Sequence, residues 1–323
     1  LARRQMASTF KPVIYSAALE DGMDPCEYLD NDSVSVEGFD DWSPENYDRS
    51  YGGKYSLAGA LAHSMNVPTF NLFRMIGFER VDSVWRLMGF SFKLDNTPSL
   101  AMGTAEASIK EVASAYSSFV NGGYTVKPHY IISIKTADGK TLYKNGPSDT
   151  TQRVLSERTC YLMQAMLQKA VNEGTGATMR SVYGVKLPLA GKTGTSQNYS
   201  DAWFTAINPG LIMVTRVGAS TREIHFNSGA NGSGSTLALP IVGLTLQKVQ
   251  QNPPLSERFF MPFPDLPEEL QGSLDCPDFK EKNVLDNIKN LFDRDKKKQN
   301  RDENKEAERI RELIRKIFRK GEY

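Results

Sequence analysis

The order of helix-like and strand-like segments most limits the folds open to this chain. Four segments carry helix patterns, at residues 12–19, 56–63, 109–120 and 157–171. Three stretches are strand-like, at residues 130–135, 202–207 and 211–217, with turn signals such as Asp138-Gly139 and Asn208-Pro209-Gly210 beside them. Because these segments do not alternate as a βαβ series, the sequence predicts an α+β fold with antiparallel strands.

Length and charge exclude some classes of protein. The chain has 323 residues, 40% of them hydrophobic, which is enough for one large domain or two smaller ones. A net charge of +1 argues against a nucleic-acid partner. No run approaches the roughly 18 consecutive apolar residues of a membrane helix. Because the first residue is Leu1 and not methionine, we expect a fragment or processed chain whose anchor lies upstream.

Composition divides the chain into three parts. Residues 1–250 have the character of a globular body, residues 251–277 form a proline-rich linker, and residues 278–323 form a charged tail. The tail carries a net charge of +4 and the remainder −3. An apolar stripe of Ile310, Leu313, Ile314, Ile317 and Phe318 fits either a helix that binds a membrane surface or protein partner, or a solvated, partly disordered tail.

The cysteines do not indicate a metal site. Cys26, Cys160 and Cys276 are odd in number, widely spaced and without a Cys-x-x-Cys pair. We expect no zinc site and no cofactor. One disulfide with one free thiol is compatible with these positions, but their spacing does not indicate which cysteines would pair.

Ser8 and Lys11 stand three residues apart at the start of an apolar helix pattern. Because proline is tolerated only near a helix start, Pro12 predicts a helix that begins at or near Ser8, and Gly22 is a natural stop. Positions i and i+3 share a helix face, so the lysine amine can lie against the serine hydroxyl and act as its base. Taken alone, the pair also fits an ordinary helix cap.

A second motif, Lys192-Thr193-Gly194-Thr195, occurs once in the chain. In a strand its two threonine hydroxyls would share one face, Gly194 would let a ligand backbone approach, and Lys192 would add a cation. These features suit a peptide carboxylate docked along a strand edge. The alternative is a turn with an ordinary lysine.

Ser-x-Asn occurs twice, as Ser64-Met65-Asn66 and as Ser196-Gln197-Asn198. A third catalytic element should come from a separate part of the chain, between the other two motifs. We therefore assign Ser64 and Asn66 to the site and regard the second occurrence as coincidental. The Ser64 hydroxyl can relay a proton, and the Asn66 amide can hold a substrate carbonyl.

Ser-x-x-Lys, Ser-x-Asn and Lys-Thr-Gly in this order form the signature of penicillin-recognising serine enzymes. The chain resembles the transpeptidase domain of a class A penicillin-binding protein over about residues 3–250, through RQMASTFKPVIYSAALEDG, NYDRSYGGKYSLAGALAHSMNVPTFNL, ASAYSSFVNGGYTVKPHYI, NEGTGATM, GKTGTS, DAWF and SGSTLALPIVG. This resemblance implies a β-lactamase/transpeptidase-like α+β fold, with an antiparallel sheet flanked by helices, a helical subdomain, and the family's N-terminal strands missing. Met6-Ala7 stands where the family usually has Pro-Gly, and Arg216 where it often has Trp.

The resemblance also implies roles for the catalytic residues. Ser8 would be the acylated nucleophile and Lys11 its base. Ser64 would shuttle the proton, and Lys192 would face the Ser64 loop. The reaction would be acyl transfer from a stem peptide ending in D-Ala-D-Ala, with release of D-Ala and cross-linking to a neighbouring amine.

Substrate contacts follow from the same resemblance. Asn66 would bind the donor peptide, and Thr193, Gly194 and Thr195 would bind its terminal carboxylate. The backbone N–H groups of Ser8 and Thr195 would form the oxyanion hole. The implied partners are peptidoglycan stem peptides and lipid-linked precursors, with β-lactams as inhibitors, at the periplasmic face of the bacterial inner membrane. The tail would contact the membrane surface or cell-wall synthesis proteins.

Three other functions share parts of this pattern. A serine β-lactamase would need a glutamate to activate a deacylating water, and Glu106, Glu111, Glu157 and Glu173 lie between the motifs without the expected Glu-x-x-Leu-Asn context. A non-catalytic penicillin sensor would be acylated without turnover. A Ser-His-Asp hydrolase is disfavoured, because the chain lacks Gly-x-Ser-x-Gly and its histidines, His63, His129 and His225, are scattered.

Overall fold

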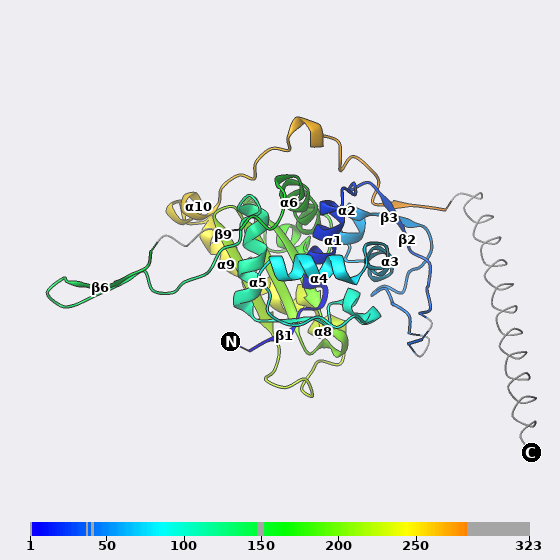
Figure 1. Ribbon diagram of the computed structural model, residues 1–323, viewed down its shortest axis with the longest axis horizontal. Helices are drawn as coiled ribbons and strands as arrows, with labels where there is room; N and C mark the ends of the chain where they lie inside the picture. The colour runs from blue at the N-terminus through cyan, green and yellow to red at the C-terminus, as the bar shows by residue number, and fades with distance from the viewer. Residues whose placement is uncertain (1, 37, 40–41, 147–151, 283–323) are drawn as a thin grey trace, which may run out of the picture. The chain divides into compact units, whose positions relative to one another are not determined.

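The structure is a computed structural model that describes residues 2–36, 38–39, 42–146 and 152–282 (Figure 1). Leu1–Phe279 forms one compact unit and Lys280–Tyr323 a second, of which only residues 280–282 are described. The apolar stripe expected at residues 310–318 therefore lies outside the described residues. Within the described part of the chain, no helix is long and apolar enough to cross a membrane.

The main sheet has three antiparallel strands in the order β7-β8-β9. β7 (Ala190–Thr195) carries the Lys-Thr-Gly motif, and β8 (Ala202–Asn208) and β9 (Leu211–Val217) confirm the two strands predicted around the Asn-Pro-Gly turn. Side chains alternate between the faces of β8: Trp203 and Ile207 join one hydrophobic cluster, whereas Phe204 and Ala206 join the other.

Helices cover both faces of this sheet, as expected for the predicted α+β fold (Figure 1). α9 (Gly234–Gln250) buries Ala238, Leu239, Val242 and Leu246 in the cluster that contains Phe204. α6 (Glu157–Asn172) packs against β7, and α5 (Ile109–Ser117) packs against β9. The structure thus confirms the helix patterns at residues 109–120 and 157–171.

The helix predicted at Ser8 is also confirmed. A 3-10 turn, η1 (Ala7–Phe10), leads into α1 (Lys11–Glu20), whose residues from Lys11 to Leu19 are all buried. A helix that is apolar on nearly every side belongs inside a protein. α1 is accordingly surrounded by α2 (Leu57–Ala62), α3 (Asn66–Ile76), α4 (Phe78–Leu87) and α6, and its neighbour Phe10 packs edge-on against Trp85.

The remaining elements of the described residues are short. The remaining helical segments are η2 (Pro98–Met102), η3 (Ser118–Val120), α7 (Thr178–Ser181), η4 (Gln197–Tyr199), α8 (Gly229–Gly232), α10 (Pro253–Phe259) and η5 (Glu268–Leu270). The remaining strands are β1 (Arg4–Gln5), β2 (Tyr28–Asp30), β3 (Lys54–Ser56), β4 (Glu106–Ala107), β5 (Ser133–Lys135), β6 (Thr141–Lys144) and β10 (Phe279–Lys280). β5 and β6 form the hairpin predicted around Asp138-Gly139.

Residues 251–277, expected as a linker, contain α10 and η5, and are bonded to the body through a Cys26–Cys276 disulfide. Cys160 is a buried free thiol. The structure therefore supplies the pairing that the cysteine spacing left open. The boundaries at residues 250 and 277 stay a prediction.

Candidate active site

The three sequence motifs meet at one cleft of about 690 Å³. Its lining includes Ser8 from η1, Ser64 from the connection between α2 and α3, Asn66 from the start of α3, and Thr193 and Thr195 from β7. These residues come from three separate parts of the chain, as predicted. Ser8 is half-buried, so its hydroxyl lies at the boundary between core and cleft.

The backbone before Ser8 adopts a conformation that L-residues avoid. Ala7 has φ 50°, in the left-handed region, where a non-glycine residue costs about 1–2 kcal/mol. Ala7 N donates to Gly103 O at 2.9 Å, and Met6 N donates to Ala105 O at 2.8 Å. A Cβ on Gly103 would lie only 1.8 Å from Ala7 O, so this approach requires glycine. The tight contact holds Ala7 in the place where the family usually has glycine.

Ser64, just after the end of α2, also adopts a left-handed backbone conformation. It has φ 58° and follows the C-cap residue His63. Met65 N donates to Ala60 O at 2.9 Å and Ser64 N to Leu61 O at 3.2 Å, which is the hydrogen-bond pattern of a Schellman motif. Glycine usually occupies this position. A serine here projects its hydroxyl beyond the helix end and toward the cleft.

Lys11 is fully buried, and its amine faces the Ser-x-Asn motif. Nζ donates to Ser64 O at 2.6 Å, Met65 O at 3.0 Å and Asn66 Oδ1 at 2.8 Å, and lies 3.4 Å from Ser64 Oγ. Among the described residues no hydrogen bond joins Lys11 Nζ to Ser8 Oγ. Burial, together with the positive charge of Lys192, holds the pKa of Lys11 well below its usual value.

Lys192 approaches Ser64 from β7. It is 1% exposed, and its Nζ donates to Ser64 Oγ at 2.8 Å and to Thr193 O at 3.2 Å. Burial lowers the pKa of Lys192 to about 7. The Ser64 hydroxyl therefore lies between two buried amines, both of which lose protons more readily than lysine in water.

The two threonines of β7 line the cleft, whereas Gly194 faces the protein. Thr193 Oγ1 hydrogen-bonds Thr175 Oγ1 at 2.6 Å, and Thr195 Oγ1 accepts from Gly234 N at 3.0 Å. A Cβ on Gly194 would lie 2.9 Å from Met6 O and 3.0 Å from Thr9 Cγ2. Gly194 therefore makes room for the turn that carries Ser8. The sequence analysis considered only the approach of a ligand backbone and did not predict this contact.

Two supporting residues escaped the sequence analysis. Asn46 is buried, and its Oδ1 accepts from Asn66 N at 2.9 Å and Val67 N at 3.0 Å, which caps α3. Thr175 contacts Thr193, as described above. Asn46 lies in a loop and Thr175 follows a glycine, both of which are common in protein sequences. No local signal therefore distinguished either residue.

Ser196 and Asn198, regarded as coincidental, also line the cleft. Ser196 Oγ accepts from Asp201 N at 2.8 Å and pairs with Ser200 Oγ at 3.0 Å, so its hydroxyl stabilises the turn between β7 and β8. The same turn contains Asp201, a fully buried carboxylate that Arg216 Nε contacts at 2.7 Å. The arginine in β9 therefore has a buried partner.

A helix-flanked antiparallel sheet with Ser-x-x-Lys, Ser-x-Asn and Lys-Thr-Gly around one cleft defines the class of penicillin-recognising proteins. Residues 2–217 match the family model described as "Penicillin binding protein transpeptidase domain", and the chain belongs to this family. Similar solved structures include penicillin-binding protein 1A from Haemophilus influenzae, with TM-score 0.71 and 24% identity over 78% of this chain and 43% of that chain. This likeness confirms the β-lactamase/transpeptidase-like fold.

Curated relatives lead to the same family. The chain is 34% identical over 248 residues to penicillin-binding protein 1A of Neisseria meningitidis, covering 74% of this chain and 30% of that protein. It is 37% identical over 246 residues to penicillin-binding protein 1A of Aquifex aeolicus, covering 74% and 32% respectively. The chain thus spans about a third of the length of these relatives.

Proposed function

We propose that this chain is a peptidoglycan D,D-transpeptidase that forms an acyl-enzyme at Ser8 and is trapped there by penicillin. The observation that supports this most is the position of Ser64 Oγ, 2.8 Å from Lys192 Nζ and 3.4 Å from Lys11 Nζ, in the cleft that Ser8 lines. A hydroxyl between two amines of lowered pKa is a ready proton relay at neutral pH.

In the acylation step Lys11 takes the proton of Ser8 as Oγ attacks the carbonyl carbon of the penultimate D-Ala. Lys11 can serve as a base because its lowered pKa leaves the amine neutral more often than in water. When the C–N bond breaks, Ser64 passes a proton to the departing D-Ala amine and is reprotonated from Lys11. An acceptor amine then attacks the ester and releases Ser8, with the proton transfers reversed.

Recognition of the substrate would use β7. Thr193 and Thr195 present hydroxyls to the cleft, and the Lys192 cation would attract the terminal carboxylate, which in turn would raise the proton affinity of Lys192. Asn66 would hold the donor peptide, and Gly194 would contribute backbone at the same strand. The N–H groups of Ser8 and Thr195 would stabilise the oxyanion by about 3–4 kcal/mol per donor.

The chain's glutamates favour a transpeptidase over a β-lactamase. Each of the four candidates has a structural partner outside the cleft lining: Glu106 with Arg222, Glu111 with Ser108, Glu157 with Arg153 and Glu173 with Lys169. Hydrogen bonds from Ser91 and Ser108 outweigh partial burial and lower the pKa of Glu111 to about 2, so this carboxylate is a poor base. A long-lived acyl-enzyme is therefore expected.

The test is labelling with a fluorescent penicillin, followed by release kinetics and a cross-linking assay. We expect one stable label per chain, loss of the label in Ser8→Ala, and cross-linking of lipid-linked precursor. Fast release would indicate a β-lactamase, and stable labelling without cross-linking would indicate a sensor. Labelling of Ser8→Ala at the rate of the unmodified chain would refute the assignment.

We place this activity in the bacterial cell envelope, with stem peptides and lipid-linked precursors as substrates and β-lactams as inhibitors. Support comes from the family, whose model is named for penicillin binding and transpeptidation. We expect neither a metal nor a cofactor to take part. Contact between the tail and a membrane or cell-wall synthesis protein stays a proposal about residues outside the described part of the chain.

A further inference from the structure

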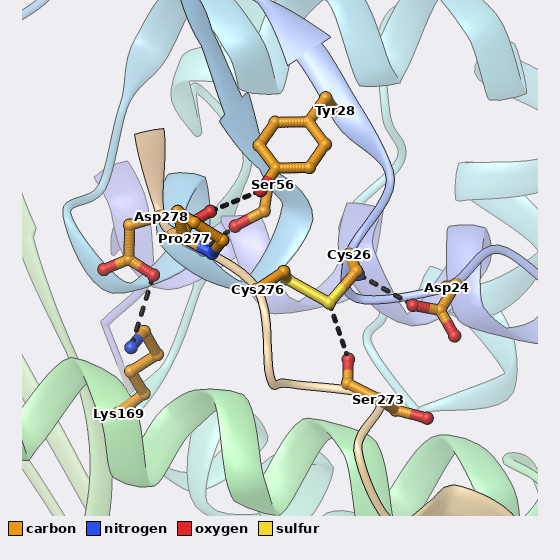
Figure 2. Close-up of a disulfide and its surroundings, with 10 residues drawn as sticks. Asp24, Cys26, Tyr28, Ser56, Lys169, Ser273, Cys276, Pro277 and Asp278 are labelled. Atoms are coloured by element: carbon orange, nitrogen blue, oxygen red, sulfur yellow. Dashed lines mark hydrogen bonds and ion pairs between the residues drawn. A yellow bond between two sulfur atoms is a disulfide. The ribbon is translucent and has the colours of Figure 1, made fainter. Parts of the chain in front are cut away.

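Asp278 lies along α2, the helix that ends at Ala62, two residues before Ser64. Ser56 N, at the start of this helix, donates to Asp278 O at 2.9 Å (Figure 2). His63 Nε2, at its end, pairs with Asp278 Oδ2 at 2.9 Å. One residue therefore contacts both ends of α2, and the second contact is directly before Ser64.

The helix is shaped to receive this residue. Gly59 stands in the middle of α2, although glycine in a helix interior is less stable than alanine. A Cβ on Gly59 would lie 2.7 Å from Cα, Cβ and O of Asp278. The absence of a side chain at Gly59 is thus what lets the segment around Asp278 lie against the helix.

The Asp278 carboxylate also contacts α6. Lys169 Nζ lies 3.2 Å from Asp278 Oδ1, and both side chains are mostly buried (Figure 2). Just beyond α6, Thr175 N donates to Ala62 O at 3.1 Å, and Thr175 Oγ1 hydrogen-bonds Thr193 Oγ1. The carboxylate therefore connects the helix before Ser64 to α6, and Thr175 in the turn after α6 contacts β7.

A covalent bond anchors this arrangement. Cys276, two residues before Asp278, forms a disulfide with Cys26 (Figure 2). Tyr28 Oη donates to Pro277 O at 2.7 Å. Between α10 and Cys276, Leu270 is buried and Phe263, Leu266 and Leu274 pack against the core, whereas the other side chains are exposed or half-buried. The disulfide adds a covalent bond to these few apolar contacts. The disulfide shortens the free chain that leads to Asp278 to a single residue, Pro277.

We propose that Asp278 is a positioning residue for Ser64, and that the Cys26–Cys276 disulfide makes acylation of Ser8 dependent on the oxidation state of these two cysteines. The proposal rests on the proposed role of Ser64 as proton relay. With the disulfide intact, Asp278 fixes His63 and the left-handed Ser64 between Lys11 and Lys192. A dithiol reductant cleaves the S–S bond with two electrons and two protons, becomes a cyclic disulfide itself, and leaves the segment held by non-covalent contacts alone.

The first experiment separates binding from chemistry. For the 323-residue chain, the rate of labelling against fluorescent penicillin concentration gives a dissociation constant for the non-covalent complex and a rate constant for acylation. We expect Asp278→Asn to lower the acylation rate constant about 10- to 100-fold, because misplacing a reacting group by about 1 Å costs up to this much. The dissociation constant should change less than about twofold, since the threonines of β7 are intact.

Asp275→Asn is the matched control. Asp275 lies on the same segment and is exposed, so its substitution removes the same charge without touching α2 or α6. We expect its acylation rate constant to equal that of the unmodified chain. A fall of equal size in both variants would overturn the proposal, because it would indicate a general effect of charge.

The second experiment tests the disulfide. Under denaturing conditions the untreated chain should titrate one thiol, from Cys160, and the dithiothreitol-treated chain three. Reduction should lower the acylation rate constant as much as Asp278→Asn does, and Cys26→Ser/Cys276→Ser should behave as the reduced chain with or without reductant. Reduction of Asp278→Asn should add little, because both changes act through one contact.

The outcomes keep the two proposals apart. If Ser8→Ala abolishes labelling but Asp278→Asn and full reduction leave the acylation rate constant unchanged, the positioning proposal is wrong and the proposed function stands. If the unmodified chain does not label at Ser8, the proposed function is wrong. Should Asp278→Asn fail to fold, the reduction of the unmodified chain, with the thiol count as its check, decides the matter alone.

Discussion

Lys192→Met should make the folded protein more stable at neutral pH while abolishing acylation. Lys192 is almost completely buried, and burial lowers its pKa from 10.5 to about 7. The folded state therefore disfavours the charged form that the unfolded chain carries at pH 7. Methionine fills a similar volume without a charge, so the substitution removes this penalty together with the amine that contacts Ser64 Oγ.

The magnitude follows from the pKa and the hydrogen bonds. The decrease in the pKa of Lys192 from 10.5 to about 7 corresponds to a free-energy penalty of about 5 kcal/mol for its charged form in the folded state, at about 1.36 kcal/mol per pKa unit. The substitution also loses the hydrogen bonds from Nζ to Ser64 Oγ and Thr193 O, worth about 1 kcal/mol each. At pH 7 Lys192 is half neutral in the folded chain, so the penalty is about 4 kcal/mol, and we expect Lys192→Met to raise the free energy of unfolding by about 2 kcal/mol.

The effect of Lys192→Met on the free energy of unfolding changes sign as the pH rises. Between about pH 7 and pH 10.5 the unfolded chain binds more protons at this lysine than the folded chain, so the stability of the unmodified protein increases through this window. At about pH 9.5 the remaining penalty is only about 1 kcal/mol, less than the two lost hydrogen bonds. Lys192→Met should then be slightly less stable than the unmodified chain.

Urea unfolding at both pH values measures the difference. Lys186→Met is the control, because Lys186 is exposed and lies shortly before the same strand, and its effect should stay within about 0.5 kcal/mol. A Lys192→Met variant that is no more stable than the unmodified chain at neutral pH would refute the reasoning. So would a stabilisation that does not diminish as the pH rises.

Two further substitutions test contacts around the site by urea unfolding. Gly59→Ala should destabilise the protein by about 1–3 kcal/mol despite the better helix propensity of alanine, because its Cβ would meet Asp278 at 2.7 Å; a variant as stable as the unmodified chain would contradict this. Arg216→Met should cost about 3–5 kcal/mol by leaving the Asp201 carboxylate buried and unpaired, and adding Asp201→Asn should recover most of this loss; no recovery would count against the pairing.

Local patterns predicted the elements that carry the site. Pro12 and the apolar run after it placed a helix start at Ser8, and the Asn-Pro-Gly turn placed the β8–β9 hairpin. These predictions succeeded because helix starts and tight turns depend on a few neighbouring residues. The order of the three motifs then indicated one shared cleft, which the family resemblance made specific.

Contacts across the sequence were harder to predict. The i, i+3 argument placed the Lys11 amine at Ser8, yet its hydrogen bonds go to Ser64 O, Met65 O and Asn66 Oδ1. A buried amine is stabilised by whatever acceptors surround it, and here these come from a segment more than 50 residues away. Helix geometry fixes where the side chain leaves the backbone, but tertiary packing decides where its end lies.

Ala7, next to the proposed nucleophile, and Ser64, the proposed proton relay, both have positive φ and illustrate the same limit. Ala7 and Ser64 occupy positions that favour glycine, so neither conformation follows from its own sequence neighbourhood. Ala7 is held by Gly103, and Ser64 follows a helix end that Asp278 contacts across 215 residues. Strain of about 1–3 kcal/mol at each residue persists only where such surroundings enforce it. A chain that kept the three motifs but lost Gly103 or Asp278 should therefore keep the site's composition and lose its geometry.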